Sequence, residues 1–396
     1  MEEQKKDFIL FGKPLIGEDE INEVVNVLKS GWIGMGPKCI EFENEFAKYV
    51  GAKHAISVSS CTAALHLSLL AAGIKSSDEV ITTALTFAAT VNAIIMTGAK
   101  PVLVDIDGKT LNIDPEKIKK AITPKTKAII PVHFGGLPCD MEKIYEIAKE
   151  HNLTVIEDAA HAIGSTWRGK KIGGLKKSMA CFSFYPNKNI TSIEGGMVTT
   201  DSDEIAEKVK TMRVHGMSNE AWKRYAKGAS LNHSWCVMPG FKYNMTDVQA
   251  ALGLGQLKKI EKFLEQREKY TKLYDSEFRG LPIRRPLSDD DHRHGLHLYL
   301  LVLDQGKTLK SRDEIVQEMR NAGIGATVHY HAIHNHPYFA EALGYKKGSF
   351  PIAEKIGETI FTLPISPSMS DDEAQYVAKT VQTIIKFSTK RVPVTV

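Results

Sequence analysis

The residues of this sequence best suited to chemistry are a lysine and an aspartate, each beside a predicted strand. Lys188 lies on the turn within residues 179–200, MACFSFYPNKNITSIEGGMVTT, between two apolar runs typical of buried strands. Asp158 ends the apolar run of residues 153–158, and an open α/β sheet places ligand-contacting groups at such strand ends. Each residue alone has an ordinary explanation, since most lysines are solvated and Asp before an Ala-rich run often caps a helix.

Together, the two side chains predict covalent chemistry with pyridoxal 5'-phosphate. This cofactor requires a lysine amine to form an imine and a carboxylate to keep its pyridine nitrogen protonated. The lysine must also be partly neutral to act as nucleophile and proton carrier, and burial or a nearby cation can lower its pKa. We therefore predict that Lys188 and Asp158 are the catalytic pair.

A second feature suited to this cofactor is the junction between a predicted strand, AISVSS, and the helix that starts at Cys61. The unpaired N–H groups and the dipole of a helix N-terminus favour a bound anion such as a phosphate. Ordinary capping of the helix by Ser60 or Thr62 is the alternative explanation.

The segments EDAAHAIGS and SFYPNKNITSIEGGM resemble those of the DegT/StrS family of sugar aminotransferases, a branch of the fold-type I pyridoxal phosphate enzymes. The resemblance covers nearly the whole chain and is greatest to the 4-amino-4-deoxy-L-arabinose branch. It implies that Lys188 bonds to the cofactor, that Asp158 pairs with the pyridinium nitrogen and that His161 lies near the phenolic oxygen. It also implies that Phe87 stacks on the ring, and that the phosphate is held by Cys61 (where the family usually has glycine), Thr62, Ala63, Ser183 and Asn244.

The same resemblance implies contacts to the substrate and to a second subunit. Candidates for the substrate cavity are Trp32 and Gly34 in the turn GWIGMGPK, and His297. The family pattern H-Y-x-x-x-H-x-x-x-Y adds His329 and Tyr330, and matches also at His334 and Tyr338. The protein is expected to be a homodimer with shared active sites, in which the polar segment 215–244 reaches the partner's site and Asn244 contacts the phosphate across the dimer.

The implied activity is a ping-pong aminotransferase reaction. By this resemblance L-glutamate gives up its amino group, and a keto sugar accepts it. The expected acceptor is a nucleotide-linked 4-keto sugar. A 3-keto nucleotide sugar or a free keto-octulosonate is an alternative substrate. Other functional classes are a non-catalytic regulator that binds the cofactor, and a lyase or desulfurase that uses Cys236 as its reactive thiol; Lys188 argues against the histidine-bearing dehydratases of the family.

Two histidine features leave further possibilities open. His133 ends a predicted strand, so a role in the site is possible. The group HYHAIHNH suggests a metal, but no matching carboxylate or cysteine pattern accompanies it, and we predict no metal site.

The hydrophobic periodicity of the sequence predicts the helices and strands that position these residues. Strands alternate with helices from residue 55 to residue 200, which predicts an α/β fold with a doubly wound, mostly parallel sheet, of the seven-stranded type that the resemblance implies. The large cofactor-binding domain is predicted to span 1–250, with an N-terminal helix at 18–30. A smaller α+β domain spans 251–396, reached by a long amphipathic stretch at 246–278 and containing a short strand at 325–330.

Composition excludes several other classes. With 396 residues, of which 43% are hydrophobic, the chain can bury a full core, and a net charge of +4 without a long basic run does not indicate nucleic-acid binding. No signal peptide or apolar run of membrane-spanning length is present, so a soluble, cytoplasmic protein is expected. Five scattered cysteines without a C-x-x-C pair fit reduced thiols.

Overall fold

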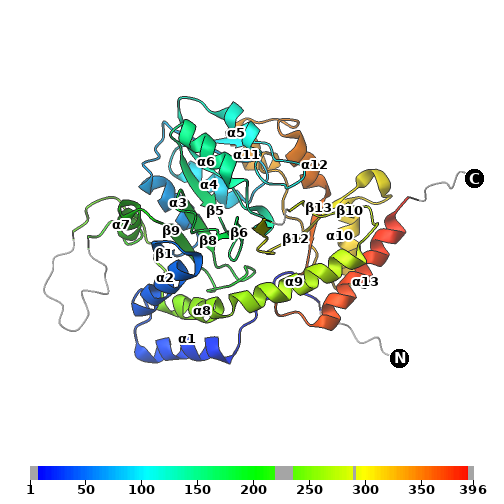
Figure 1. Ribbon diagram of the computed structural model, residues 1–396, viewed down its shortest axis with the longest axis horizontal. Coiled ribbons are helices and arrows are strands. Elements are labelled where there is room, and N and C mark those ends of the chain that lie inside the picture. The colour runs from blue at the N-terminus through cyan, green and yellow to red at the C-terminus, as the bar shows by residue number, and fades with distance from the viewer. Residues whose placement is uncertain (1–7, 219–234, 289–290, 391–396) are drawn as a thin grey trace, which may run out of the picture.

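A computed structural model describes residues 8–218, 235–288 and 291–390 (Figure 1). Its largest element is a seven-stranded sheet of order β1-β9-β8-β5-β4-β2-β3. Strand β9 is antiparallel to both of its neighbours, and the other six strands run in one direction, which confirms the mostly parallel sheet. The strands are β1 (His54–Val58), β2 (Glu79–Thr83), β3 (Lys100–Val104), β4 (Thr126–Ile130), β5 (Thr154–Asp158), β8 (Met179–Ser183) and β9 (Gly196–Thr200).

Helices cover both faces of this sheet because successive strand residues point to opposite faces. In β5, Val155 packs into one core cluster and Ile156 into the other. The first cluster lies under α2 (Pro37–Val50), α5 (Pro115–Ala121), α6 (Met141–Glu150) and α8 (Asp247–Lys258), and the second under α3 (Cys61–Ala71), α4 (Ala88–Met96) and α7 (Asp203–Met212).

The C-terminal part of the chain forms a smaller layer of helices on a three-stranded antiparallel sheet, β10-β12-β13. Its core joins Tyr299 and Phe361 to apolar residues of three helices. Short 3₁₀ turns occur at Phe134–Gly136, Gln305–Lys307 and Ile333–Asn335. The elements are β10 (Ile283–Arg284), β12 (Tyr299–Leu303), β13 (Ile360–Leu363), α9 (Ile260–Glu277), α10 (Arg312–Asn321), α11 (Pro337–Leu343), α12 (Pro351–Thr359) and α13 (Asp371–Ser388), with a separate small sheet of β11 (His292–Arg293), β6 (Thr166–Trp167) and β7 (Lys170–Lys171).

The stretch 246–278 differs from its prediction. It divides at Lys259 into α8 and α9, and α9 continues toward α13 (Figure 1). Helix α8 is buried on most sides rather than amphipathic, because α1 (Glu18–Ser30) and α2 both pack against it. Gly253 and Gly255 permit this, since a Cβ atom would lie 2.8 Å from the Phe42 ring at the first and 2.7 Å from Glu20 Cγ at the second.

Two further points concern the domains. The predicted strand at 325–330 is wrong, since of these residues Thr327 alone pairs, in an isolated bridge with Thr362. Ile9, assigned to the large domain, exchanges backbone hydrogen bonds with Gly323 and Gly325 of the C-terminal part. The division at residue 250 falls within α8 and stays a prediction.

Across the described ranges, no helix has the length and apolarity that crossing a bilayer requires.

Candidate active site

The carboxyl edge of the large sheet brings the predicted site residues together. Asp158 is the last residue of β5, and Ser183 is the last residue of the parallel neighbour β8. Helix α3 starts at Cys61, just after the carboxyl end of β1, and α4 follows β2. Since these strands run in one direction, their ends and the following helix starts meet at one edge, where open α/β sheets bind ligands.

Lys188 lies between β8 and β9, as predicted, on a loop held by several hydrogen bonds. The Lys188 amide donates to the Tyr185 carbonyl at 2.9 Å, and the Asn189 side chain donates to the Gly295 carbonyl at 2.6 Å. Lys188 Nζ lies 3.4 Å from His297 Nε2. Burial lowers the pKa of the Lys188 amine to about 8, although Cys61 and Asp158 favour its charged form.

Asp158 is buried and hydrogen-bonded through both carboxylate oxygens. Thr90 Oγ1 donates to Oδ2 at 2.7 Å, and the Ala160 amide donates to Oδ1 at 3.1 Å. Burial raises the pKa of this carboxyl, while the two hydrogen bonds and the positive charge of Lys188 act in the opposite direction. Asp158 and the loop that carries Lys188 thus lie at the ends of two neighbouring parallel strands.

The α3 N-terminus shows the expected cap together with open donors. Ser60 Oγ accepts the Ala63 amide at 3.1 Å, so the capping explanation holds for Ser60. In the described part of the chain, the Cys61 and Thr62 amides have no acceptor. The Cys61 thiol turns inward and donates to the Cys181 carbonyl at 3.3 Å, and burial raises its pKa, so a backbone role fits this residue.

Ser183 and Asn244 border the same edge. Ser183 is half-buried, and its hydroxyl accepts the Tyr185 amide at 3.4 Å. Asn244 forms a bridge with Val58 at the end of β1, and its buried Oδ1 has no partner in the described ranges. The predicted reach of segment 215–244 into a second subunit falls largely on residues 219–234, which lie outside the described residues.

Aromatic and imidazole side chains form one wall around Lys188. The His161 ring lies 4.5 Å from the His297 ring, and Tyr330 Oη lies 3.4 Å from His161 Nε2. Burial and the nearby Lys188 charge lower the pKa of His161 and His297 well below the usual value and that of His329 to about 3. These imidazoles are therefore neutral hydrogen-bonding groups.

The other predicted contacts are placed less centrally. Phe87 precedes α4, is 58% exposed, and has its ring 5.7 Å from that of Tyr330. Trp32 is half-buried in the turn between α1 and α2, where a Cβ on Gly36 would clash with its indole. The Gly34 carbonyl accepts the Asp247 amide at 2.8 Å. Among the described residues, no hydrogen bond or ring contact joins Trp32 or Gly34 to the wall around Lys188.

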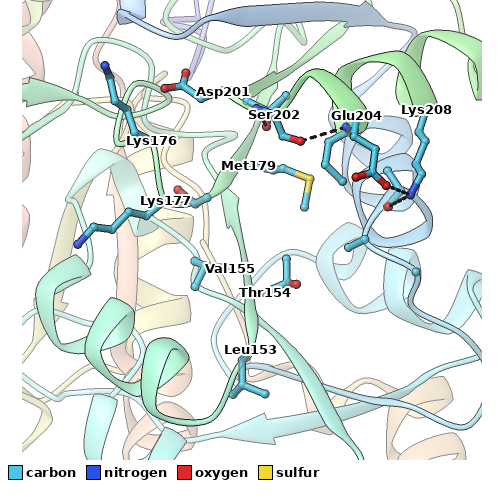
Figure 2. A pocket seen from close by; sticks show the side chains of 16 residues that line it. Leu153, Thr154, Val155, Lys176, Lys177, Met179, Asp201, Ser202, Glu204 and Lys208 are labelled. Carbon is cyan, nitrogen blue, oxygen red and sulfur yellow. Dashed lines mark hydrogen bonds and ion pairs between the residues drawn. The ribbon is translucent and has the colours of Figure 1, made fainter.

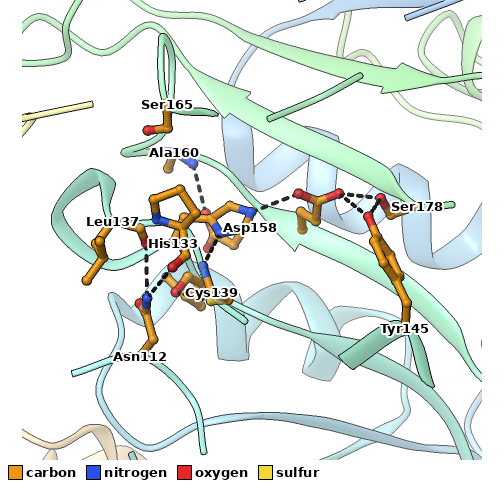
Figure 3. A network of polar contacts seen from close by, with 12 residues as sticks. Asn112, His133, Leu137, Cys139, Tyr145, Asp158, Ala160, Ser165 and Ser178 are labelled. Atoms are coloured by element: carbon orange, nitrogen blue, oxygen red, sulfur yellow. Dashed lines mark hydrogen bonds and ion pairs between the residues drawn. The ribbon is translucent and has the colours of Figure 1, made fainter. Parts of the chain in front are cut away.

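His133 belongs to a buried network of polar contacts (Figure 3). Its Nε2 donates to Glu157 at 2.8 Å, and its Nδ1 accepts the Cys139 amide at 3.0 Å. Glu157 also accepts from Tyr145 Oη at 3.3 Å and from the Ser178 hydroxyl. Both ring nitrogens of His133 are thus used in the core, which leaves neither for a substrate.

The second histidine of the H-Y-x-x-x-H-x-x-x-Y pattern is engaged in the core. His334 Nε2 pairs with Glu354 at 2.8 Å and is buried, and Tyr338 is 60% exposed. His329 Nδ1 instead lies 3.0 Å from Thr362 Oγ1. Within the described ranges, no three His, Cys, Asp or Glu side chains gather as a metal site would need.

Thr90, whose hydroxyl donates to Asp158 Oδ2 at 2.7 Å, is not among the residues that the sequence predicts for the site. The segment TFAAT shows only that Thr90 lies one helical turn after Phe87, and nothing in it indicates the contact with Asp158. Cys236, the candidate desulfurase thiol, is exposed and donates to the His215 and Met238 carbonyls at 3.5 and 3.4 Å.

A groove of about 720 Å³ lies at the opposite edge of the sheet (Figure 2). It is lined by the amino ends of β5 and β8 and by α7, and Lys208 is joined there to Glu204 at 2.7 Å. The groove lacks Lys188 and Asp158, so the carboxyl edge is the candidate active site.

Comparisons with known proteins identify the family. A model of the DegT/DnrJ/EryC1/StrS aminotransferase family matches residues 14–382. The chain belongs to this family. An uncharacterized protein of Methanocaldococcus jannaschii is 49% identical over 96% of this chain and 98% of its own length. The spore coat polysaccharide biosynthesis protein SpsC of Bacillus subtilis is 47% identical over 98% of this chain and 99% of its own.

Solved structures of the family have the same fold. The sugar aminotransferase Spr1654 of Streptococcus pneumoniae in its PMP-form superposes with a TM-score of 0.89, at 33% identity, over 96% of this chain and 99% of that one. Its PLP-form superposes with a TM-score of 0.88. This DegT-family chain is accordingly a pyridoxal-phosphate-dependent sugar aminotransferase.

The residues at the carboxyl edge fit this cofactor. A half-buried lysine with a lowered pKa suits its aldehyde, and the carboxylate of Asp158 suits its ring nitrogen. The acceptor-free amides of Cys61 and Thr62 at a helix N-terminus suit its phosphate.

Proposed function

We propose that this enzyme transfers the amino group of L-glutamate to a nucleotide-linked 4-keto sugar, with Lys188 and Asp158 as the catalytic residues. The observation that carries the proposal is the shared sheet edge: Asp158 ends β5, and Lys188, whose Nζ lies 3.4 Å from His297 Nε2, lies on the loop after the neighbouring parallel strand β8. Amine and carboxylate in this arrangement match the two requirements of pyridoxal phosphate chemistry.

Lys188 acts as nucleophile and proton carrier. With a pKa of about 8, a substantial share of the amine is neutral near physiological pH and can attack a carbonyl carbon. When bound, pyridoxal phosphate supplies that aldehyde and a ring that takes up the electron pair left on the substrate carbon. The released Lys188 amine then moves the proton, and His297 Nε2 at 3.4 Å orients it.

Asp158 and His161 fix charges around that ring. Asp158, held by Thr90 and Ala160, presents a negative charge that favours a protonated ring nitrogen. His161 Nδ1 accepts the Gly135 amide at 3.2 Å, so the neutral ring carries its proton on Nε2. His161 is thereby a hydrogen-bond donor on the site side.

The choice of a keto sugar rests on the neutral wall and on the relatives. His297, His329 and Tyr330 offer hydrogen bonds without charge, which suits a substrate rich in hydroxyl groups. SpsC of Bacillus subtilis is named for polysaccharide biosynthesis, which favours a sugar as the acceptor. The 4-keto position is proposed because the segment NITSIEGGM resembles the 4-keto branch of the family.

A homodimer with shared sites is part of the proposal. Large apolar side chains stay exposed around Lys188, with Phe87 at 58%, Tyr185 at 48% and Ile193 at 52%. Apolar groups gathered beside a buried reactive site are typical of a surface that a second subunit covers.

The test supplies the holoenzyme with glutamate and a panel of keto sugars that differ in the keto position and in the nucleotide. Products are read by mass spectrometry and NMR. Lys188→Ala is expected to abolish turnover, whereas Lys177→Ala, in the groove at the opposite edge, retains it. Full turnover by Lys188→Ala refutes the catalytic assignment, and amination at another carbon refutes the 4-keto substrate.

A further inference from the structure

A chain of two hydroxyl groups leads from the core to the carboxylate of Asp158. Thr86 Oγ1 lies 2.7 Å from Thr90 Oγ1, and Thr90 Oγ1 donates to Asp158 Oδ2 at 2.7 Å. A threonine hydroxyl has one proton, and that of Thr90 goes to the carboxylate. Thr86 must therefore donate to Thr90, which gives the chain one direction, toward Asp158.

Burial makes these hydrogen bonds consequential. Thr86 is 1% exposed and Thr90 0% exposed, so water cannot take the place of a missing hydroxyl without rearrangement. Chained hydrogen bonds strengthen one another in such surroundings, and a bond to a charged acceptor is stronger than one between neutral groups. Desolvation disfavours the charged carboxylate of Asp158, and the donated protons oppose that effect.

The geometry of the carboxylate shows what the chain fixes. Ala160, two residues along the chain, donates to Oδ1, whereas Thr90 reaches Oδ2 from the first turn of α4. The Ala160 amide lies two residues from Asp158, so this contact does not depend on how another element packs. The Thr90 contact is the one that ties the carboxylate to a different element and sets its rotation.

We propose that Thr90, backed by Thr86, is a positioning residue that holds Asp158 as an oriented carboxylate toward the pyridine nitrogen of the cofactor. This inference rests on the role proposed above for Asp158. Thr90 itself does not touch the cofactor in this scheme and acts through Asp158.

The test uses holoenzyme reconstituted with pyridoxal phosphate that carries ¹⁵N in its ring. NMR of that nitrogen reports its protonation, and steady-state kinetics with glutamate and a keto sugar separate kcat from KM. Thr90→Val keeps the shape of the side chain and removes the donor. Thr90→Ser keeps the hydroxyl, and Thr90→Ala, which suits helix α4 better, serves if the valine variant does not fold.

Matched controls come from the same sheet. Thr82 is also fully buried, and its hydroxyl donates to the Ile130 carbonyl at 2.9 Å without touching Asp158. Thr82→Val therefore reports the cost of losing a buried hydroxyl as such. Asp158→Asn reports the loss of the carboxylate itself.

Thr90→Val is expected to move the ring-nitrogen signal toward that of an unprotonated pyridine and to lower kcat about tenfold, with KM changed less than about twofold. Thr90→Ser restores both readouts, Thr86→Val lowers kcat about threefold, and Thr82→Val leaves both readouts unchanged. If Asp158→Asn moves the nitrogen signal while Thr90→Val matches Thr82→Val, the positioning role is overturned and the proposed function stands. If Asp158→Asn also leaves the signal unchanged, the role of Asp158 fails, and that of Thr90 fails with it.

Discussion

Glu157 and Asp158 are consecutive carboxylates at the end of β5, and the structure gives them opposite surroundings. Successive side chains of a strand point to opposite faces, so Glu157 meets α6 and Asp158 meets α4. Glu157 accepts hydrogen bonds from His133, Tyr145 and Ser178 on both oxygens (Figure 3). Asp158 accepts from Thr90 and Ala160 and faces the charge of Lys188.

The difference shows how one strand separates stability from chemistry. A carboxylate whose oxygens are fully engaged by core donors can only hold elements together, here the segment after β4, helix α6 and the segment before β8. The carboxylate of Asp158, by contrast, can still interact with a positive charge. It can therefore influence a ligand that binds between it and Lys188. Substitutions at the two positions should therefore affect different measurements.

The largest effect is expected for Asp158→Asn. Loss of the negative charge beside the ring nitrogen should lower kcat by about 10² to 10³-fold, since electrostatic groups preorganised toward developing charge contribute on this scale. The free energy of unfolding, measured in urea, should change little. Steady-state kinetics with glutamate and a keto sugar, beside circular dichroism, check both parts.

Glu157→Gln is the matched control for that experiment. Its oxygen can still accept from His133, and its amide can donate to the hydroxyls of Tyr145 and Ser178, which can act as acceptors. Activity per folded protein should stay within about threefold, because the side chain does not face the site. An activity loss as large as that of Asp158→Asn contradicts the separation of the two carboxylates.

An intermediate effect, on stability, is expected for His133→Ala. Removing the partner of a fully buried carboxylate leaves a charge with less compensation and should lower the free energy of unfolding by about 3 kcal/mol. Urea unfolding followed by fluorescence measures this, and KM for glutamate of the remaining folded enzyme should be unchanged.

His334→Ala provides the comparison within the same chain. Its partner Glu354 is 8% exposed, whereas Glu157 is 0% exposed, and Glu354 keeps the backbone amides of Gly348 and Phe350, so the loss should be smaller than for His133→Ala. Equal losses at the two sites would show that burial of the carboxylate does not decide the cost.

The sequence predicted the position of the site better than its internal contacts. Strand alternation and the strand-end rule located Lys188 and Asp158, because both depend on local pattern and on sheet direction. Thr90 was not singled out, since its importance depends on the distance between α4 and β5, which no local pattern contains. His334 matched a family spacing, yet its role is decided by Glu354, twenty residues further along the chain.

Contacts between distant segments also explain why two elements were predicted wrongly. Helix α8 was predicted to be amphipathic, but small residues let α1 and α2 cover it from two sides. The sequence at 325–330 has strand-like residues, yet pairing depends on what lies beside β13, and Thr327 alone meets Thr362 there. Pairing partners distant in sequence are thus the information that periodicity lacks.

The smallest effect is expected for Tyr145→Phe. The phenol donates to Glu157 Oε1 over 3.3 Å and its oxygen lies 2.8 Å from Ser178 Oγ, and the Ser178 hydroxyl still donates to the same carboxylate oxygen after the change. The aromatic ring stays in place, so the packing of α6 and the approach of Lys177 over its face, at 5.5 Å, are retained.

The free energy of unfolding should fall by about 1 kcal/mol, the usual net value of one hydrogen bond, while kcat stays unchanged. The same urea experiment measures the first, and glutamate kinetics the second. A loss as large as that of His133→Ala would make Tyr145, and not His133, the main partner of Glu157. A fall in kcat would mean that the network on the α6 side reaches the active site through the backbone of β5, so that the two carboxylates are coupled.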